Sequence, residues 1–370
     1  MGRRRIHLAA LTLALLVACS QSSGPSDLVR QGRRHVEASR CAEVNRYAEA
    51  ISNLREALSE DPNKSEAYYW LYLAHAESGD SAEAASVLSS LEETVAAGDE
   101  DVEAKFWLLK IYSESGDAAG QQRLLVELEA AAEADPEDPD VAFYLARGRY
   151  ALGDLEGALE ALQSAAALDP NHTLAHFWLG QVYFEQQRLD RARQEFDTVL
   201  RLDPDNAAAY HNRGVTAYRM GDIEQALADL RAARDRDASD FQTRYQLGAI
   251  HLTQALPAVP MSSPDEDGLQ KAEEEFEAAL TACPSMPEPL IGLGNLHLIR
   301  GEPAVALEYL NQAVEQLPDS PEVWFALGQA YASLGRVGDA CGALDSFSDL
   351  SPPPEWGEQA EEMQTELGCP

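Results

Sequence analysis

A fixed pattern of small, large apolar and polar residues recurs along the chain every 34 residues. The period is clearest in units 173–206 and 207–240, and units 139–172, 287–320 and 321–354 share it. Counted from the first residue of each unit, position 8 is small, position 20 is nearly always alanine and position 24 is always Leu or Phe. Small residues let two antiparallel helices approach closely, and large apolar residues fill the space between them. The pattern therefore predicts a helical hairpin in each unit.

Glycine and proline mark the expected helix ends. Position 15 ends the first helix of six units in a left-handed cap, with Gly79, Gly116, Gly153, Gly221, Gly301 and Gly335. Position 32 ends the second helix of six units with a proline, which cannot continue the hydrogen-bond ladder: Pro62, Pro170, Pro204, Pro284, Pro318 and Pro352.

This pattern resembles the tetratricopeptide repeat, a 34-residue helical hairpin. The resemblance implies an all-α fold, a right-handed superhelical solenoid of about nine hairpins with a C-terminal cap helix at 355–370. The expected units are 31–64, 65–98, 102–135, 139–172, 173–206, 207–240, 241–286, 287–320 and 321–354. The first and third units match the pattern less well. Because one hairpin cannot bury its apolar face alone, stacked neighbours share a continuous core. One solenoid thus replaces the two or three domains that 370 residues would otherwise indicate.

The first 18 residues are typical of an export signal. Three arginines at 3–5 precede an apolar run at 8–18, which is too short to span a bilayer but fits a secretory signal. The run ends in Leu-Val-Ala-Cys at Cys19, which resembles the lipobox of bacterial lipoproteins. The resemblance implies lipidation of Cys19, a flexible tether at 19–30 and, because Ser20 follows in place of Asp, the periplasmic face of the outer membrane. An ordinary signal peptide with a chance cysteine is the alternative.

The charge of the chain excludes some classes of partner. It has 63 acidic and 28 basic residues, a formal net charge of −35. Nucleic acid is not expected as a partner, because phosphate binding needs a basic stripe. Five cysteines do not make a disulfide framework, and 45% apolar residues are ordinary for a folded protein.

Most residues that could carry chemistry are better explained by structural roles. Arg213 occupies core position 7, where its neighbours have leucine, and similar repeats pair this arginine with the equivalent of Asp229. A structural ion pair is therefore expected, with a ligand role as the alternative. His172 and His176 have the spacing of two metal ligands on one helix, but no third ligand is indicated. Without a nucleophile elbow, a phosphate-binding loop or a Cys-x-x-Cys motif, we expect no enzyme, cofactor, metal or small-molecule substrate.

Cys341 begins the second helix of the last hairpin, and Cys369 ends the cap helix. Antiparallel packing of these two helices would bring the two cysteines together. In an oxidising periplasm they would form a disulfide, and two free thiols are the alternative. The seventh unit carries an insertion at 255–268 between its helices, which is either a partner contact or a tolerated surface loop.

In the family that the chain resembles, the first helices line a groove that binds peptides or helices. The matching positions here are Phe143, Arg147, Tyr150, Phe177, Gln181, Phe184, His211, Tyr218, Arg219 and Tyr245. Aromatic and arginine side chains suit protein binding, although about half of these residues would pack between adjacent first helices instead. We therefore expect a lipid-anchored periplasmic scaffold that binds other proteins in envelope assembly, such as pilus, secretion or outer-membrane assembly. An adaptor of cell-wall enzymes is the alternative, and a glycan-binding protein or enzyme a remote one.

Overall fold

The computed structural model of the chain describes residues 26, 28–31, 33, 36, 46–98, 101–256, 263–352 and 354–369. Several expectations fall outside these residues: the signal peptide, lipidation at Cys19, most of the tether at 19–30, much of the first hairpin, and residues 257–262 of the insertion.

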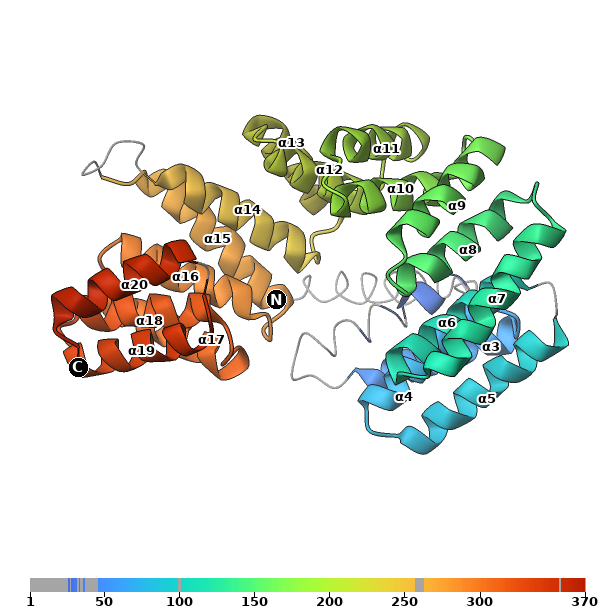
Figure 1. The fold of residues 1–370 in the computed structure, drawn as a ribbon, viewed down its shortest axis with the longest axis horizontal. Coiled ribbons are helices and arrows are strands. Elements are labelled where there is room, and N and C mark those ends of the chain that lie inside the picture. Colours follow the sequence, from blue (N-terminus) through green and yellow to red (C-terminus); the bar gives the residue numbers. More distant parts are fainter. Residues whose placement is uncertain are drawn as a thin grey trace, which may run out of the picture. The chain divides into compact units, whose positions relative to one another are not determined.

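Within the described ranges the regular structure is entirely helical, which confirms the predicted all-α fold. The helices, labelled as in Figure 1, are α3 (Tyr47–Glu60), α4 (Ser65–Glu77), α5 (Ser81–Ala97), α6 (Val102–Ser115), α7 (Ala118–Ala134), α8 (Pro139–Ala151), α9 (Leu155–Leu168), α10 (Thr173–Glu185), α11 (Leu189–Leu202), α12 (Ala207–Arg219), α13 (Ile223–Arg236), α14 (Phe241–Ala255), α15 (Glu266–Ala282), α16 (Pro287–Ile299), α17 (Pro303–Gln316), α18 (Pro321–Ser333), α19 (Val337–Asp349) and α20 (Pro354–Leu367).

The chain forms two compact units, each described by itself. The first comprises Met1–Ser39, Val44–Pro136 and Arg147–Asp154, and the second comprises Arg40–Glu43, Glu137–Ala146 and Leu155–Pro370. The first unit therefore contains α3 to α7 and the end of α8, and the second contains the start of α8 and α9 to α20.

In the first unit, α4 packs against α5 and α6 packs against α7, while α3 and α4, α4 and α6, and α5 and α6 also contact one another. Gly116 ends α6 in the left-handed conformation, with φ 76°. Asp117 follows, and its side chain accepts a hydrogen bond from the backbone N–H of Gly120 at the start of α7. The Gly-Asp dipeptide thus closes one helix and begins the next.

In the second unit, neighbouring helices pack in pairs, α10 with α11, α12 with α13, α14 with α15, α16 with α17 and α18 with α19 (Figure 1). Each second helix also packs against the first helix of the next pair, as α11 does against α12. This is the arrangement of a tetratricopeptide-type solenoid, and it gives successive hairpins a shared core.

Close approach inside each hairpin depends on small residues at position 8. A Cβ added to Gly180 would lie 2.5 Å from the ring of Phe196, and one added to Gly294 would lie 2.5 Å from Leu310. Real Cβ atoms do not come that close, so the large residue at position 24 occupies the space that glycine leaves empty.

The cap helix α20 packs against α19. Its Ala360 is buried in a cluster with Leu344 and Phe347, and Trp356 and Met363 pack at the edge of that cluster. No helix among the described residues is both long and apolar enough to cross a lipid bilayer.

Candidate protein-binding site

The expected groove residues of the second unit differ in exposure. Phe143 on α8 is buried and packs edge-on against Tyr144 and tilted against His172. Phe177 on α10 contacts the ring of Phe196 and packs on the buried end of α11. Both rings contribute to the packing of helices.

A more accessible patch lies across α10 and α12. Gln181 and Phe184 are half-buried on successive turns of α10, and Tyr218 is half-buried on α12. Arg219 is exposed at the end of α12, and its guanidinium carbon lies 5.7 Å from the centre of the Phe184 ring. This is a cation–π arrangement. We call these four residues the Phe184 patch.

His211 and Tyr245 of the expected groove are held by protein partners. His211 Nδ1 lies 2.7 Å from Thr243 Oγ1, and the Thr243 hydroxyl also donates to Asp240. Burial lowers the pKa of His211, with Asp240 opposing that shift. Tyr245 packs against Phe276, and burial raises its pKa. Burial thus favours the neutral form of both side chains, and contacts within the protein hold them in place.

Arg147 and Tyr150 lie on the part of α8 that belongs to the first unit. Arg147 places its guanidinium carbon 4.5 Å from the centre of the Phe106 ring, and Tyr150 is half-buried. Arg147 and Phe106 thus form a separate cation–aromatic contact within that unit.

Arg213 is held between two carboxylates. Its Nε and Nη2 donate to Asp229 at 2.7 and 2.6 Å, and its Nη1 donates to Asp197 at 2.6 Å. The Asp229 side chain is only 4% exposed and that of Arg213 is 19% exposed. The hydrogen bond to Asp229 raises the pKa of Arg213, so the guanidinium stays charged. These hydrogen bonds link α12 to α13 and to α11. They use all three nitrogens of the Arg213 guanidinium, so this side chain is not available to bind a ligand.

The two histidines with metal-ligand spacing use their ring nitrogens for structural contacts. His172 Nδ1 accepts a hydrogen bond from the backbone N–H of Ala175 and so caps α10, while Nε2 lies 3.1 Å from Asp140. His176 Nδ1 lies 2.7 Å from Glu195 Oε2. In the part of the chain that the structure describes, no three His, Cys, Asp or Glu side chains are grouped to hold a metal ion.

Cys341 and Cys369 are joined by a disulfide with Cα atoms 5.6 Å apart. The bond links the start of α19 to the residue that follows the cap helix. Cys283 is disulfide-bonded as well.

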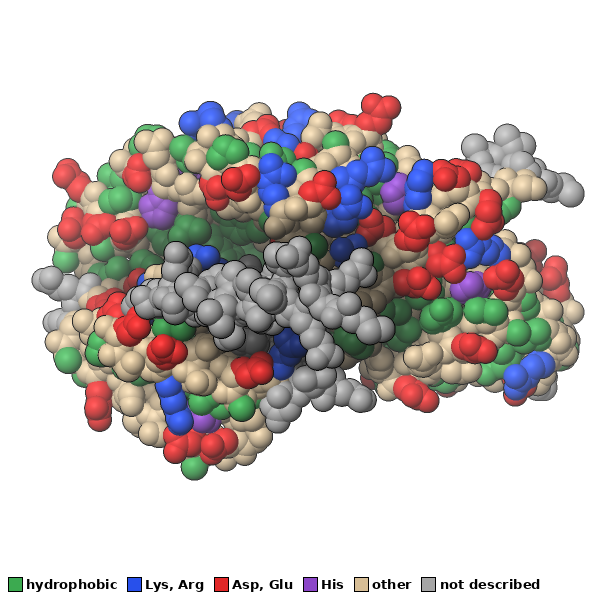
Figure 2. Space-filling model, turned by 180° about the vertical axis from the view of Figure 1, so that it is seen from behind, with side chains coloured by type: hydrophobic (Ala, Val, Ile, Leu, Met, Phe, Trp, Pro, Cys, Tyr) green, Lys and Arg blue, Asp and Glu red, His purple; other side chains and the backbone are tan. Residues whose placement is uncertain are grey.

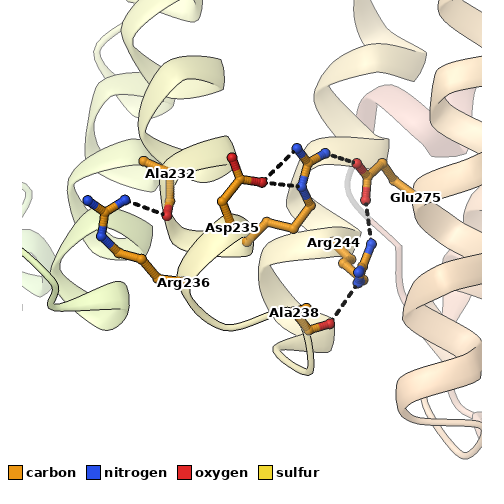
Figure 3. A network of polar contacts seen from close by, with 7 residues as sticks. Ala232, Asp235, Arg236, Ala238, Arg244 and Glu275 are labelled. Carbon is orange, nitrogen blue, oxygen red and sulfur yellow. Dashed lines mark hydrogen bonds and ion pairs between the residues drawn. The ribbon is translucent and has the colours of Figure 1, made fainter. Parts of the chain in front are cut away.

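One polar network was not foreseen from the sequence. The carboxylate of Glu275 on α15, 12% exposed, accepts hydrogen bonds from Arg234 at 2.6 Å and from Arg244 at 3.2 Å (Figure 3). Arg234 also donates to Asp235. The partners are 31 and 41 residues apart, so only the packing of α13, α14 and α15 brings them together. An unusual run of arginines from 231 to 244 was the one available signal.

The fold and the contacts above define a helical-repeat protein with a patch of half-buried aromatic side chains and one exposed arginine on two of its first helices, α10 and α12. Family models described as tetratricopeptide repeat match residues 42–104, 149–212, 211–287 and 291–352, well over half of the chain. The chain belongs to the tetratricopeptide repeat family. Proteins of this family are generally non-catalytic scaffolds, and the repeat suggests protein or peptide partners.

Solved structures show the same fold. A chain of the human IFIT1 dimer with m7Gppp-AAAA is 15% identical with a TM-score of 0.58, over 96% of this chain and 84% of its own. A chain of the APC/C hetero-tetramer Cut9–Hcn1 is 15% identical with a TM-score of 0.59, over 86% and 59%. PilF of Pseudomonas aeruginosa is 19% identical with a TM-score of 0.50, over 61% and 96%. At these identities the likeness shows the fold alone. No curated protein sequence matches significantly.

Proposed function

We propose that the chain is a lipid-anchored scaffold on the periplasmic face of the outer membrane, and that its Phe184 patch binds a protein partner during assembly of an envelope complex. The observation that carries the binding proposal is the exposed Arg219 guanidinium stacked on Phe184, next to Gln181 and Tyr218. An aromatic ring and an arginine fork supply large contact area and several donors at modest entropic cost.

Two features support the proposed location. The lipobox-like sequence at Cys19 provides the site for the lipid, although it lies outside the described residues. The Cys341–Cys369 disulfide is the kind of bond that persists in an oxidising compartment such as the periplasm. If the anchor is correct, Cys19→Ala should move the protein from the membrane fraction to the soluble fraction of the cell. Retention of Cys19→Ala in membranes would contradict a lipid anchor at that cysteine.

Partner binding is tested by reversible crosslinking in the native cell, followed by affinity capture and mass spectrometry. The test variant is Phe184→Ala with Arg219→Ala. A matched control is Tyr331→Ala with Arg336→Ala, because Arg336 stacks on Tyr331 in the same way, with 4.6 Å to the ring centre.

We expect the test variant to lose the envelope proteins that the wild type and the control retain, with unchanged helical content by circular dichroism. Equal capture by both variants would contradict binding at the Phe184 patch. Specific capture of cell-wall enzymes would support binding at the Phe184 patch, but it would replace envelope-complex assembly with the regulation of those enzymes as the proposed function.

A further inference from the structure

The negative charge of the chain is unevenly distributed. Residues 188–244 contain ten arginines and no lysine against eleven Asp and Glu residues, whereas the rest contains 18 basic and 52 acidic residues. This stretch covers α11, α12 and α13 in the second unit. Figure 2 shows Lys and Arg side chains gathered over these helices at the top of the view. An almost neutral segment therefore lies within a strongly acidic chain.

Most carboxylates of this segment already have partners. Asp197 and Asp229 bind Arg213, and Glu195 is hydrogen-bonded to His176. Other acidic residues cap helices, since the Asp222 side chain accepts the N–H of Gln225 and the Asp240 side chain that of Gln242. These carboxylates are held in place and so are not free to turn toward neighbouring arginines.

Besides Arg219 of the Phe184 patch, four exposed arginines of the same segment form no ion pair within the described residues of the second unit, and we call these four the arginine surface. They are Arg188 before α11, Arg191 and Arg201 on α11, and Arg231 on α13. Arg188 is positioned by stacking 4.5 Å from the centre of the Tyr183 ring. Among the described residues the Arg191 guanidinium donates only to the side-chain oxygen of Gln194, at 3.4 Å. Their charges are therefore not neutralised by the protein.

Because the basic residues of this surface are all arginines, its chemistry favours some anionic ligands over others. Its planar guanidinium presents donors in a fork that matches a carboxylate in bidentate geometry, which a lysine ammonium cannot do. A long polyanion such as a nucleic acid, or an anionic membrane, would extend beyond these helices onto the acidic remainder of the chain and be repelled there. A short acidic peptide segment can satisfy the arginines without that cost.

We propose that the arginine surface docks an Asp- and Glu-rich segment of a partner protein. The surface lies on the second helices α11 and α13 and on the turn before α11, whereas the Phe184 patch lies on the first helices α10 and α12. The two surfaces share no residue, so each can be removed by substitution without changing the residues of the other.

The test uses the mature chain and a fluorescein-labelled peptide of about ten alternating Asp and Glu residues, measured by fluorescence anisotropy. The variant is Arg191→Gln with Arg201→Gln and Arg231→Gln, since Gln has nearly the helix propensity of Arg. The matched control removes the same charge from ion-paired sites, as Arg55→Gln with Lys271→Gln and Arg336→Gln. These three side chains pair with Glu83, Asp267 and Asp339.

We expect salt-sensitive binding that weakens by about tenfold or more in the variant, which corresponds to the loss of about one charge-assisted contact, and by less than about twofold in the control. The Phe184→Ala with Arg219→Ala variant should bind the acidic peptide as the wild type does. Loss of cellular partners in that variant therefore tests the Phe184 patch alone, and loss of the acidic peptide in the triple arginine variant tests the arginine surface alone.

Three results would overturn the proposal. The first is an equal loss of peptide binding in the variant and in the charge-matched control, which would show that only the net charge matters. The second is binding of a single-stranded DNA of matched charge, or of vesicles that contain anionic phospholipid, that is as tight as peptide binding or tighter and is lost in the same variant. The third is the absence of any peptide binding to the wild type at low salt.

Discussion

At the scale of single residues, the size of the side chain at position 8 sets how closely the two helices of a hairpin approach. The sequence pattern predicted this correctly, because Gly180 and Gly294 leave room for Phe196 and Leu310. Exposure of the groove residues was harder to predict. Phe143 is buried and Phe184 is half-buried, although both were assigned to the same groove, because their exposure depends on packing against neighbouring helices.

Gly180→Ala should therefore destabilise the protein, because the new Cβ would meet the Phe196 ring at 2.5 Å. Overpacking of this kind typically costs about 1–3 kcal/mol. Gly342→Ala on α19 is the matched control, since a Cβ there meets nothing within 4 Å and alanine is favoured in a helix interior by about 0.5–1 kcal/mol. Thermal unfolding should show a lower melting temperature for the first variant and an unchanged or higher one for the second. Equal effects of the two substitutions would be inconsistent with close packing at Gly180.

His176 should make stability depend on pH. Its hydrogen bond to Glu195 raises its pKa above the ordinary value of 6.5, although burial opposes the rise. A histidine with a raised pKa in the folded state contributes stability that is fully present below pH 6.5 and is lost as the pH rises through the folded pKa. His176→Gln should therefore lower the melting temperature more at about pH 5.5 than at about pH 8.5.

His251 provides the opposite case for comparison. Burial, with help from nearby cations such as Arg231 and Lys271, lowers its pKa. The neutral ring is therefore favoured in the fold, and acid removes that contribution as the pH falls from 6.5 through the folded pKa. The difference between wild type and His251→Gln should change with pH in the opposite direction. A pH-independent difference for both variants would contradict this account.

At the scale of helices, the positions of Gly-Asp dipeptides and of prolines predicted most helix ends. These residues determine helix caps and the direction of the chain through local geometry. The network in which Arg234 and Arg244 share Glu275 was missed. It depends on the packing of three helices, which no local pattern reports.

The cap helix gives a prediction at the same scale. The Cys341–Cys369 disulfide closes a loop across α19 and α20, with a sequence separation of 28 residues. Replacing both cysteines with serine should destabilise the last hairpin and the cap by about 3–4 kcal/mol in the chain-entropy picture. Hydrogen exchange should become faster in α20 first. Mass spectrometry that finds both thiols alkylatable without reduction, in protein taken from the native cell, would contradict the bond.

At the scale of the whole molecule, the net charge of −35 argued against nucleic acid as a partner, and within the described residues the structure adds exposed arginines without an ion pair on α11 and α13. Net charge describes the sum over the chain and says little about one surface. The repeat period, in contrast, determines the fold directly, because each hairpin needs the next to bury its apolar face.

The most direct measurement of the central claim, that the Phe184 patch binds a protein, is site-specific photocrosslinking in the native cell. A photoreactive amino acid is placed at Arg219, which is exposed beside Phe184, and at Arg336 as the control, which is exposed beside Tyr331. The account predicts a discrete covalent adduct with an envelope protein from position 219 and none from position 336. Adducts of equal yield from both positions, or none from position 219, would contradict it.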